Sequence, residues 1–185
     1  MEHKDSNKIL TGRMKKIAKM LSKHYTVKIG LLASQGGSKQ VSENMDLAGI
    51  GAVQEYGANI NVTDKMRNYL RYAFGMNLKK STTSINIPAR SWLYAPIKDE
   101  GFRKLIYDYI GDEELFEEYA DKDIMKELAN IIGNAGLLQI QKAFENGGIN
   151  GEWAANSPIT IANKGSAKPL IDTGDLRRHV TFEVE

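Results

Sequence analysis

The tripeptide Asp172-Thr173-Gly174 has the residue types with which an aspartic protease presents its catalytic carboxylate, and an apolar pair precedes it as in those enzymes. That chemistry needs two aspartates that share one proton and that come from two domains or two subunits. Only 13 residues follow Asp172, too few for the strands that support such a loop, and the residue after Gly174 is the charged Asp175. We therefore expect a capped turn without catalysis, in which Gly174 supplies a positive φ and the aspartates accept hydrogen bonds from backbone amides.

Other residue types that could carry chemistry are scattered along the chain. The three histidines, His3, His24 and His179, lie far apart and show none of the spacings of a metal site. The sequence has no cysteine, which excludes a disulfide, a thiolate zinc site and a thiol nucleophile. It also lacks a phosphate-binding loop, a complete dinucleotide fingerprint and a Gly-x-Ser-x-Gly elbow. We expect no metal, no cofactor and no enzymatic activity.

Length and composition predict one folded domain over residues 1–185. Hydrophobic residues make up 42% and charged residues 26% of the chain, which are the proportions of a globular protein. The formal net charge of +2 provides no global field that would draw the protein to nucleic acid or to an anionic membrane. No apolar run approaches the roughly 20 residues of a membrane span, and the polar start lacks a signal-peptide core. We expect no membrane partner.

The elements that would position the Asp172 turn begin with an amphipathic helix. Apolar residues recur at helical spacing over 8–23, with lysines on the other face. Alternation over 25–31 then predicts a strand with one buried face. The small and polar residues of 33–46 indicate a mobile surface loop, and a short helix follows that ends at Gly57.

Residues 58–86 are predicted to form a strand-helix-strand insertion. Thr63 or Asp64 can cap a helix that continues to about Lys80. Pro88 ends the second strand, because proline has no amide hydrogen for a sheet hydrogen bond. The apolar side of the helix is expected to be buried and consists of Met66, Leu70, Ala73 and Phe74.

A long helical segment is predicted after the insertion. Helical spacing runs over 112–146, either as one helix or as two that join near 120–123. Acidic residues are dense at its start, where the helix dipole stabilises them. Gly133 and Gly136 inside the pattern should each cost about 1 kcal/mol relative to alanine. They imply close packing or a kink.

The C-terminal part is predicted to contain an irregular arm and a final strand. Residues 149–175 show little periodicity and form the arm. Alternation over 179–184 predicts a strand that returns to the sheet begun at Tyr25. The predicted fold class is α+β, an antiparallel sheet packed by helices that include one long helix.

Lysines on the helix predicted over 8–23 leave a second function open. Such a face could contact DNA phosphates, and Lys164, Lys168, Arg177 and Arg178 add a basic patch near the C-terminus. No reader motif or stacking aromatic accompanies either patch, so a solvated surface is the simpler interpretation. A DNA-binding accessory protein is the alternative function, and its DNA contact would be non-specific.

Three stretches of the sequence, taken in their order along the chain, resemble the motifs of a known family. The QEYG stretch is "IGAVQEYGA" (50–58), the PAR stretch is "IPARSWL" (87–93), and the DTG stretch covers 152–184 and contains "KPLIDTGDL". Together they resemble the bacteriophage virion-morphogenesis family, the neck and tail-completion proteins of Mu-like and other long-tailed phages and prophages. Gln54 stands where the family usually has histidine, and Ser91 and Trp92 stand at a Pro-Phe pair. The matching residues are Glu55, Tyr56, Gly57, Pro88, Ala89, Arg90, Trp153, Thr160, Lys164, Gly165, Pro169, Leu170, Ile171, Asp172, Thr173, Gly174 and Leu176.

The resemblance implies a non-enzymatic structural protein that acts in virion assembly, at the head-tail junction or the head-proximal end of the tail. It implies a ring, expected to be a hexamer, whose partners are other copies and phage neck, connector or tail-tube and terminator proteins. The protein would reside in the virion or a tail-like particle, and in the host cytoplasm during assembly. A heterologous ring interface needs two different complementary surfaces. The loop 33–46 and the arm 149–175 are the candidates, and the DTG turn would aim the arm into the last strand.

Overall fold

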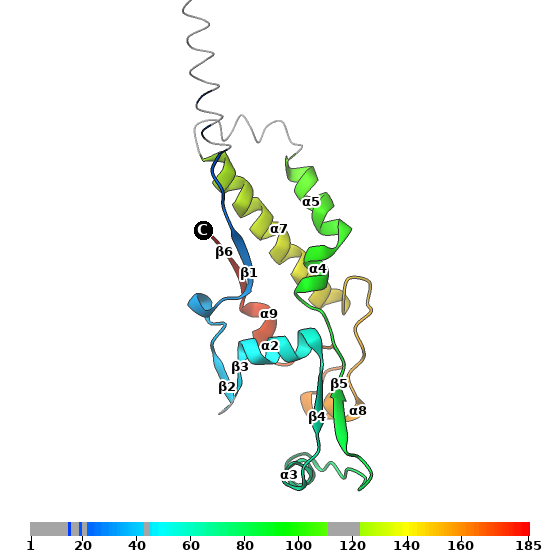
Figure 1. The fold of residues 1–185 in the computed structure, drawn as a ribbon. Helices are drawn as coiled ribbons and strands as arrows, with labels where there is room; N and C mark the ends of the chain where they lie inside the picture. Colours follow the sequence, from blue (N-terminus) through cyan, green and yellow to red (C-terminus); the bar gives the residue numbers. More distant parts are fainter. Residues whose placement is uncertain (1–14, 16–18, 20–21, 43–44, 111–122) are drawn as a thin grey trace, which may run out of the picture.

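The fold is α+β, as predicted, with antiparallel strand pairs packed by helices (Figure 1). The computed structural model describes residues 15, 19, 22–42, 45–110 and 123–185. The helix predicted over 8–23 and the beginning of the one predicted from residue 112 therefore lie largely outside the described residues. In chain order the elements are β1 (Val27–Leu31), η1 (Ala33–Gln35), β2 (Gln40–Ser42), β3 (Met45–Asp46), α2 (Leu47–Tyr56), β4 (Ala58–Asn61), α3 (Asp64–Phe74), β5 (Ser84–Ile87), α4 (Tyr94–Lys98), α5 (Glu100–Ile110), α7 (Ile124–Asn146), α8 (Pro158–Lys164), α9 (Asp175–Arg178) and β6 (Val180–Val184).

The strand pair β1–β6 joins the two ends of the described chain. Its register runs from Val27 opposite Val184 to Leu31 opposite Val180. The predicted return of the last strand to the first is confirmed. The described strands form three separate antiparallel pairs, β1–β6, β2–β3 and β4–β5.

The long helix α7 packs against both strands of the β1–β6 pair and against α4 and α5. A Cβ atom on Gly133 would lie 2.2 Å from the ring of Phe182 in β6, and one on Gly136 would lie 2.5 Å from Ile29 in β1. The close packing predicted for these two glycines is confirmed. Their lack of a side chain lets the helix axis approach the strands that it covers.

Aromatic side chains form the centre of the core. The ring of Phe144 on α7 has its centroid 6.0 Å from that of Trp92 and 5.6 Å from that of Trp153. The other buried members of the cluster are Leu47, Ile140, Ala143, Leu176 and Val180. These residues come from α2, α7, α9, β6 and the segments around them, so one core joins the first half of the chain to the second.

The short helix α2 begins and ends as predicted. The side chain of Asp46 accepts the backbone N–H of Gly49 at 2.7 Å and caps the first turn. A Cβ atom on Gly57, the residue after the helix, would lie 2.8 Å from the backbone oxygen of Ile87. Only glycine therefore lets the chain turn this close to the end of β5.

The segment 33–46, predicted as a mobile loop, contains η1 and the strand pair β2–β3. The hydroxyl of Thr181 donates to the side chain of Gln35 at 3.1 Å, and the hydroxyl of Ser34 donates to Glu183. Both contacts tie η1 to β6. The described part of the segment is therefore anchored to the main strand pair.

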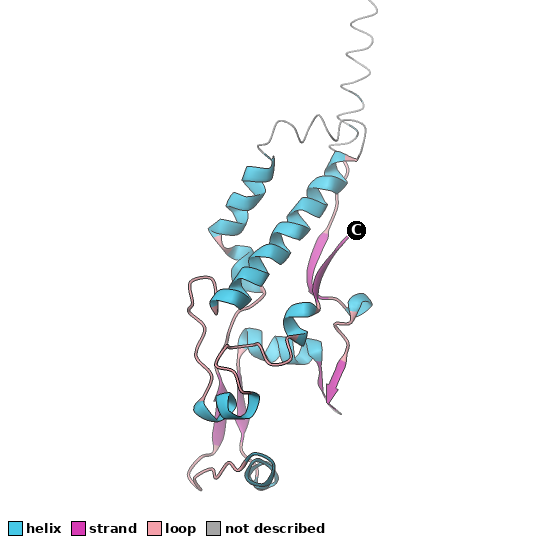
Figure 2. Cartoon of the chain, turned by 180° about the vertical axis from the view of Figure 1, so that it is seen from behind, coloured by secondary structure: helices cyan, strands magenta, loops and turns pink. Residues whose placement is uncertain are grey.

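The strands β4 and β5 form a ribbon that carries α3 at its far end (Figures 1 and 2). Their register runs from Ala58 opposite Ile87 to Asn61 opposite Ser84. The predicted strand-helix-strand insertion is confirmed, and β5 ends directly before Pro88 as expected. We call this unit, residues 58–87, the ribbon arm.

Two predictions about α3 were wrong. The helix ends at Phe74 and not near Lys80, because Gly75 adopts a φ of 64° and its N–H donates to the backbone oxygen of Arg71 at 3.0 Å. Its apolar side is not buried as expected: Met66 and Leu70 are half-buried, whereas Ala73 and Phe74 are exposed. The tip of a two-stranded ribbon offers too little neighbouring chain to cover a helix.

The segment 149–175 was predicted to be irregular, but it contains α8. The Ser157 hydroxyl accepts the backbone N–H of Thr160 at 3.2 Å, Pro158 occupies the first turn, and Gly165 ends the helix. The side-chain amide of Asn156 donates to the backbone oxygens of Ala167 and Lys168, both at 3.2 Å. These contacts fold the segment back on itself.

Among the described helices, none is long and apolar enough to cross a membrane.

Candidate functional site

Glu55 lies at the C-terminal end of α2, and its carboxylate is the centre of a buried hydrogen-bond network. The residue is only 7% exposed. One oxygen accepts the backbone N–H groups of Trp92 and Leu93, each at 2.8 Å. The other accepts the N–H of Tyr94 at 3.1 Å and the hydroxyl of Ser91. Because the N–H groups at a helix start lack intrahelical partners, Glu55 caps α4 from a distant part of the sequence.

Arg90 is the second charged residue of this network and is also 7% exposed. Its Nε donates to the backbone oxygen of Ala154 at 2.8 Å, and one Nη donates to that of Ala155 at 3.3 Å. The other Nη donates to the side-chain oxygen of Gln54 at 3.2 Å. Burial lowers the pKa of Arg90. The guanidinium therefore fastens the start of the C-terminal arm to α2.

The three family-like stretches meet at this point. Glu55 and Gln54 belong to the QEYG stretch, Arg90 and Trp92 to the PAR stretch, and Trp153 to the DTG stretch. The Trp92 indole N–H donates to the backbone oxygen of Gly51 at 2.9 Å, which adds a third link between the first two stretches. We call Glu55, Arg90 and the groups that bind them the Glu55–Arg90 network.

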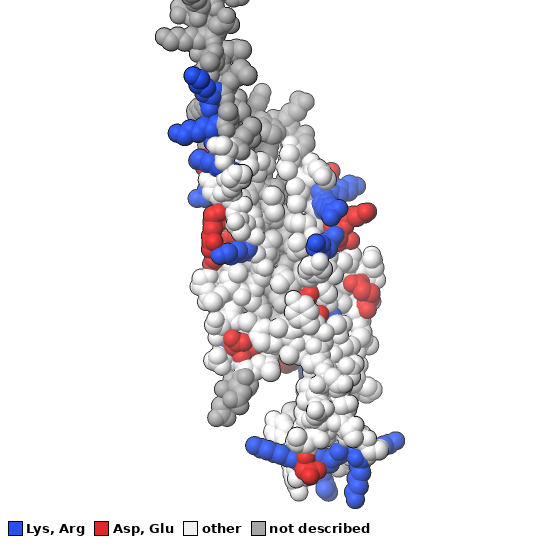
Figure 3. Space-filling view, viewed as in Figure 1, with Lys and Arg blue, Asp and Glu red and all other residues white. Residues whose placement is uncertain are grey.

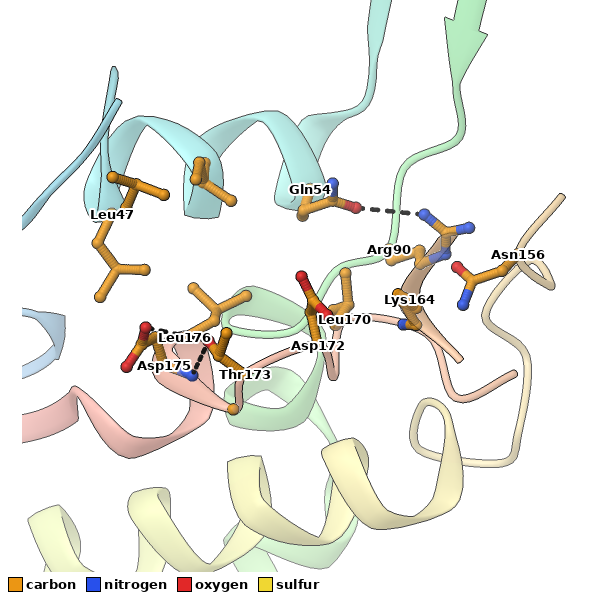
Figure 4. Close-up of a pocket in the computed structure, with 13 residues that line it drawn as sticks. Leu47, Gln54, Arg90, Asn156, Lys164, Leu170, Asp172, Thr173, Asp175 and Leu176 are labelled. Atoms are coloured by element: carbon orange, nitrogen blue, oxygen red, sulfur yellow. Dashed lines mark hydrogen bonds between the residues drawn. The ribbon is translucent and has the colours of Figure 1, made fainter. Parts of the chain in front are cut away.

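A pocket of about 290 Å³ lies beside the network, bounded by α2, α8 and α9 (Figure 4). Figure 4 shows Arg90, Lys164 and Asn156 gathered at one end, and Thr173 and Asp175 at the other. Apolar side chains supply much of the remaining wall, namely Val41, Leu47, Ile50, Leu170 and Leu176. Seven matched residues of the sequence line it: Arg90, Lys164, Leu170, Asp172, Thr173, Gly174 and Leu176.

The Asp172-Thr173-Gly174 turn leads the chain into α9, and Gly174 has the predicted positive φ, 79°. The expected role of the aspartates as backbone caps is wrong for Asp175. The Thr173 hydroxyl accepts the Asp175 N–H at 3.3 Å, while the Asp175 carboxylate accepts from the Thr173 hydroxyl at 3.0 Å and from Arg178 at 2.7 Å. A threonine hydroxyl therefore replaces the carboxylate as the backbone acceptor. Asp172 itself is exposed and lines the pocket.

Charge around the Asp175 carboxylate stabilises its ionised form. The hydrogen bond from Arg178 is the largest cause, followed by those from Thr173 and Lys39, and together they hold the pKa of Asp175 well below its usual range. The Lys39 ammonium lies 3.2 Å from the carboxylate. This ion pair also ties the segment before α2 to the DTG turn.

Lys164 and Leu170 bring the arm to the same pocket. The Lys164 ammonium donates to the backbone oxygen of Lys168, and burial lowers its pKa, against the opposing effect of Asp172. Leu170 adopts a φ of 57°, a left-handed conformation that costs a leucine about 1 to 2 kcal/mol. Its side chain packs on the core cluster. Backbone strain of this kind is found at sites that the surrounding structure holds in place.

Other residues matched in the sequence do not join the pocket lining. Tyr56 is 80% exposed, and Ala89 and Gly165 are exposed as well. Pro88 and Pro169 are half-buried. The sequence reasoning assigned no role to Asn156 or Lys39, both of which contribute to the site. Lys39 pairs with Asp175 far along the chain and Asn156 binds the backbone of Ala167 and Lys168, so no helix or strand periodicity identifies them.

The charged groups of the Glu55–Arg90 network are occupied mainly by backbone amides and carbonyls. Within the described part of the chain, no group of three or more His, Cys, Asp or Glu side chains could hold a metal ion. No protein-family model, no curated protein and no solved structure matches the chain.

Proposed function

We propose that the protein is a non-enzymatic structural subunit of a phage or phage-tail-like particle, acting at the head-tail junction or the head-proximal end of the tail. The observation that carries the proposal is the meeting of the QEYG, PAR and DTG stretches in one place. Residues that look like family motifs in the sequence are drawn together by Glu55 and Arg90. Arg90 reaches the third stretch through the backbone oxygens of Ala154 and Ala155, so the three stretches share one hydrogen-bond network.

The use of charge at the site favours a scaffolding role. Glu55 accepts three backbone N–H groups, and Arg90 donates to two backbone oxygens. Buried charges that bind backbone groups fix the path of the chain. Their function in this proposal is to hold the arm and its pocket in a defined shape for a neighbouring subunit.

The two expected ring surfaces border a single pocket. Val41 from the segment 33–46 and Asn156 from the arm both line it. A ring needs a second, different surface on each subunit. We propose the α5–α7 face for it, where Tyr107 is 73%, Tyr109 49% and Leu138 45% exposed. Tyrosine is among the residues that are enriched in protein interfaces.

Quantitative peptide mass spectrometry of purified particles tests the proposal. The expected result is a constant copy number relative to a known particle protein, close to the six or so that a hexameric ring requires. A matched pair of variants, Leu138→Glu on the α5–α7 face and Glu145→Gln on the last turn of α7, tests the proposed surface. The first should be lost from particles and the second retained. Absence of the wild-type chain from purified particles would refute the structural role.

A further inference from the structure

The ribbon arm presents a helix that the rest of the described chain does not cover. Figure 1 shows α3 at the end of the β4–β5 ribbon, away from α7 and the core. No residue of α3 is buried. Tyr72 is 83% and Tyr69 60% exposed. A folded helix held out from the body with no buried residue is a surface that needs an explanation.

Positive charge is concentrated on this arm. Residues 58–87 contain five Lys or Arg and one Asp, which gives a net charge of +4. The whole chain has a formal charge of +2, so the remaining residues sum to −2. Figure 3 shows Lys and Arg side chains radiating from the tip with a single acidic group among them. The exposed basic residues are Lys65, Arg71, Lys79 and Lys80.

The outward side of α3 has a regular pattern of hydrogen-bond donors. Lys65, Asn68, Tyr69 and Tyr72 occupy positions i, i+3, i+4 and i+7, which lie on one face of a helix. All four are exposed. The guanidinium of Arg71 lies 5.9 Å from the centroid of the Tyr72 ring and extends the basic surface beside it.

The fifth basic residue, Arg67, holds the tip in shape. Its two Nη atoms donate to the backbone oxygens of Leu78 at 3.1 Å, Lys79 at 2.8 Å and Thr82 at 2.9 Å. These bonds fasten the loop after α3 to the helix. Lys79 and Lys80 are thereby held on the same tip as α3 before any partner arrives, which reduces the ordering cost of binding.

We infer that the tip of the ribbon arm binds the phosphate backbone of double-stranded DNA without sequence specificity. Lys, Arg, Asn and Tyr side chains are the groups that contact DNA phosphates, and a single α-helix fits the major groove. Tyr69, Tyr72 and Arg71 would also suit a protein interface, but the net charge of +4 and the three exposed lysines match a polyanion better, because lysine is depleted at the centre of protein interfaces. The inference stands apart from the proposed role in assembly, since a chain absent from particles can still bind DNA through this tip.

Fluorescence anisotropy of the full chain with a labelled duplex of mixed sequence, over a range of salt, tests the inference. Four exposed cations that each neutralise one phosphate predict a slope of about −3.6 for log affinity against log salt. The double variant Lys79→Ala, Lys80→Ala should reduce the slope to about −1.8. The control Arg103→Ala, Lys104→Ala removes the same charge from exposed positions on α5 and should leave the slope unchanged.

Three results would overturn the inference. Absence of duplex binding at low salt would mean that the basic tip serves another partner, such as an acidic protein surface. An unchanged slope in the Lys79→Ala, Lys80→Ala variant would place the DNA contact elsewhere, for instance on residues 8–23. Tighter binding to the single strand than to the duplex would indicate that base stacking, and not contact with the phosphates of a duplex, provides the affinity. Circular dichroism of both variants verifies that neither change unfolds the chain.

Discussion

The carboxylate of Glu55 accepts the backbone N–H of Trp92 at 2.8 Å, although 37 positions separate the two residues in the sequence. This bond joins the last turn of α2 to the start of α4. Trp92 in turn donates its indole N–H to Gly51 on α2, so the two segments are linked in both directions. The account of the site depends on this junction, because Arg90 and the pocket are positioned by it.

Replacing Glu55 by glutamine tests the junction. Each carboxylate oxygen of Glu55 now accepts hydrogen bonds from two donors, and the glutamine NH2 group would face two of these donors without being able to accept from them. The variant should therefore lose about 2 to 4 kcal/mol of unfolding free energy. Denaturant unfolding followed by tryptophan fluorescence measures the loss. Glu145→Gln, an exposed site on α7, is the control and should change stability by less than about 0.5 kcal/mol. Equal stability of the two variants would contradict the capping role of Glu55.

Arg90→Lys should weaken the attachment of the C-terminal arm, residues 149–175, although the variant keeps the positive charge. Lysine cannot donate from separate nitrogens to Ala154, Ala155 and Gln54, so we expect a loss of about 1 to 3 kcal/mol. Hydrogen exchange should also quicken over residues 153–157. Arg103→Lys at an exposed position of α5 provides the control. Unchanged exchange in the arm would show that Arg90 does not fasten it.

Gly133→Ala should destabilise the protein even though alanine favours a helix by about 1 kcal/mol. The new Cβ would meet the ring of Phe182, and overpacking of this kind costs about 1 to 3 kcal/mol. Asn134→Ala, at the exposed neighbouring position, serves as the control. Adding Phe182→Leu to Gly133→Ala should cost less than the sum of the two single changes. Strict additivity would mean that the two residues are not in contact.

The ion pairs of Asp175 predict a pH dependence. Its folded pKa is depressed, chiefly by Arg178, below the usual carboxyl value of about 3.9. The stabilisation is therefore fully present above that value and is lost as the pH falls through it towards the folded pKa. The melting temperature of Asp175→Asn should lie below that of the wild type at pH 7, and the difference between the two melting temperatures should narrow below about pH 4. Asp108→Asn on α5 is the control, and a gap independent of pH would argue against the ion pairs.

Local sequence patterns were sufficient to predict those helices and strands whose apolar side packs against another element of the same chain. The alternation after His179 and the spacing through Gly133 gave the correct β6 and α7, because each packs on the other. The same reasoning wrongly predicted that the apolar side of α3 is buried. An amphipathic pattern does not show whether the apolar side packs against this chain or against another molecule. The seven-residue α8 is too short for periodicity to reveal, yet Ser157-Pro158 and Gly165 mark its ends.

The candidate site was predictable only in part. The resemblance indicated Glu55, Arg90 and the DTG turn, but nothing local says that they meet. Their contact depends on how α2, α4 and the arm pack around Phe144, and that packing is a property of the whole core. Lys39 and Asn156 joined the site for the same reason. Spacing in the sequence carries no information on such long-range contacts.

The most direct measurement for the central claim is electron microscopy of induced lysates from a strain that lacks the gene, beside the same strain complemented with the wild-type chain. The account predicts that deletion leaves full heads separate from finished tails, or tails of abnormal length or with frayed ends, and that complementation restores whole particles. Normal, infectious particles from the deletion strain would contradict it.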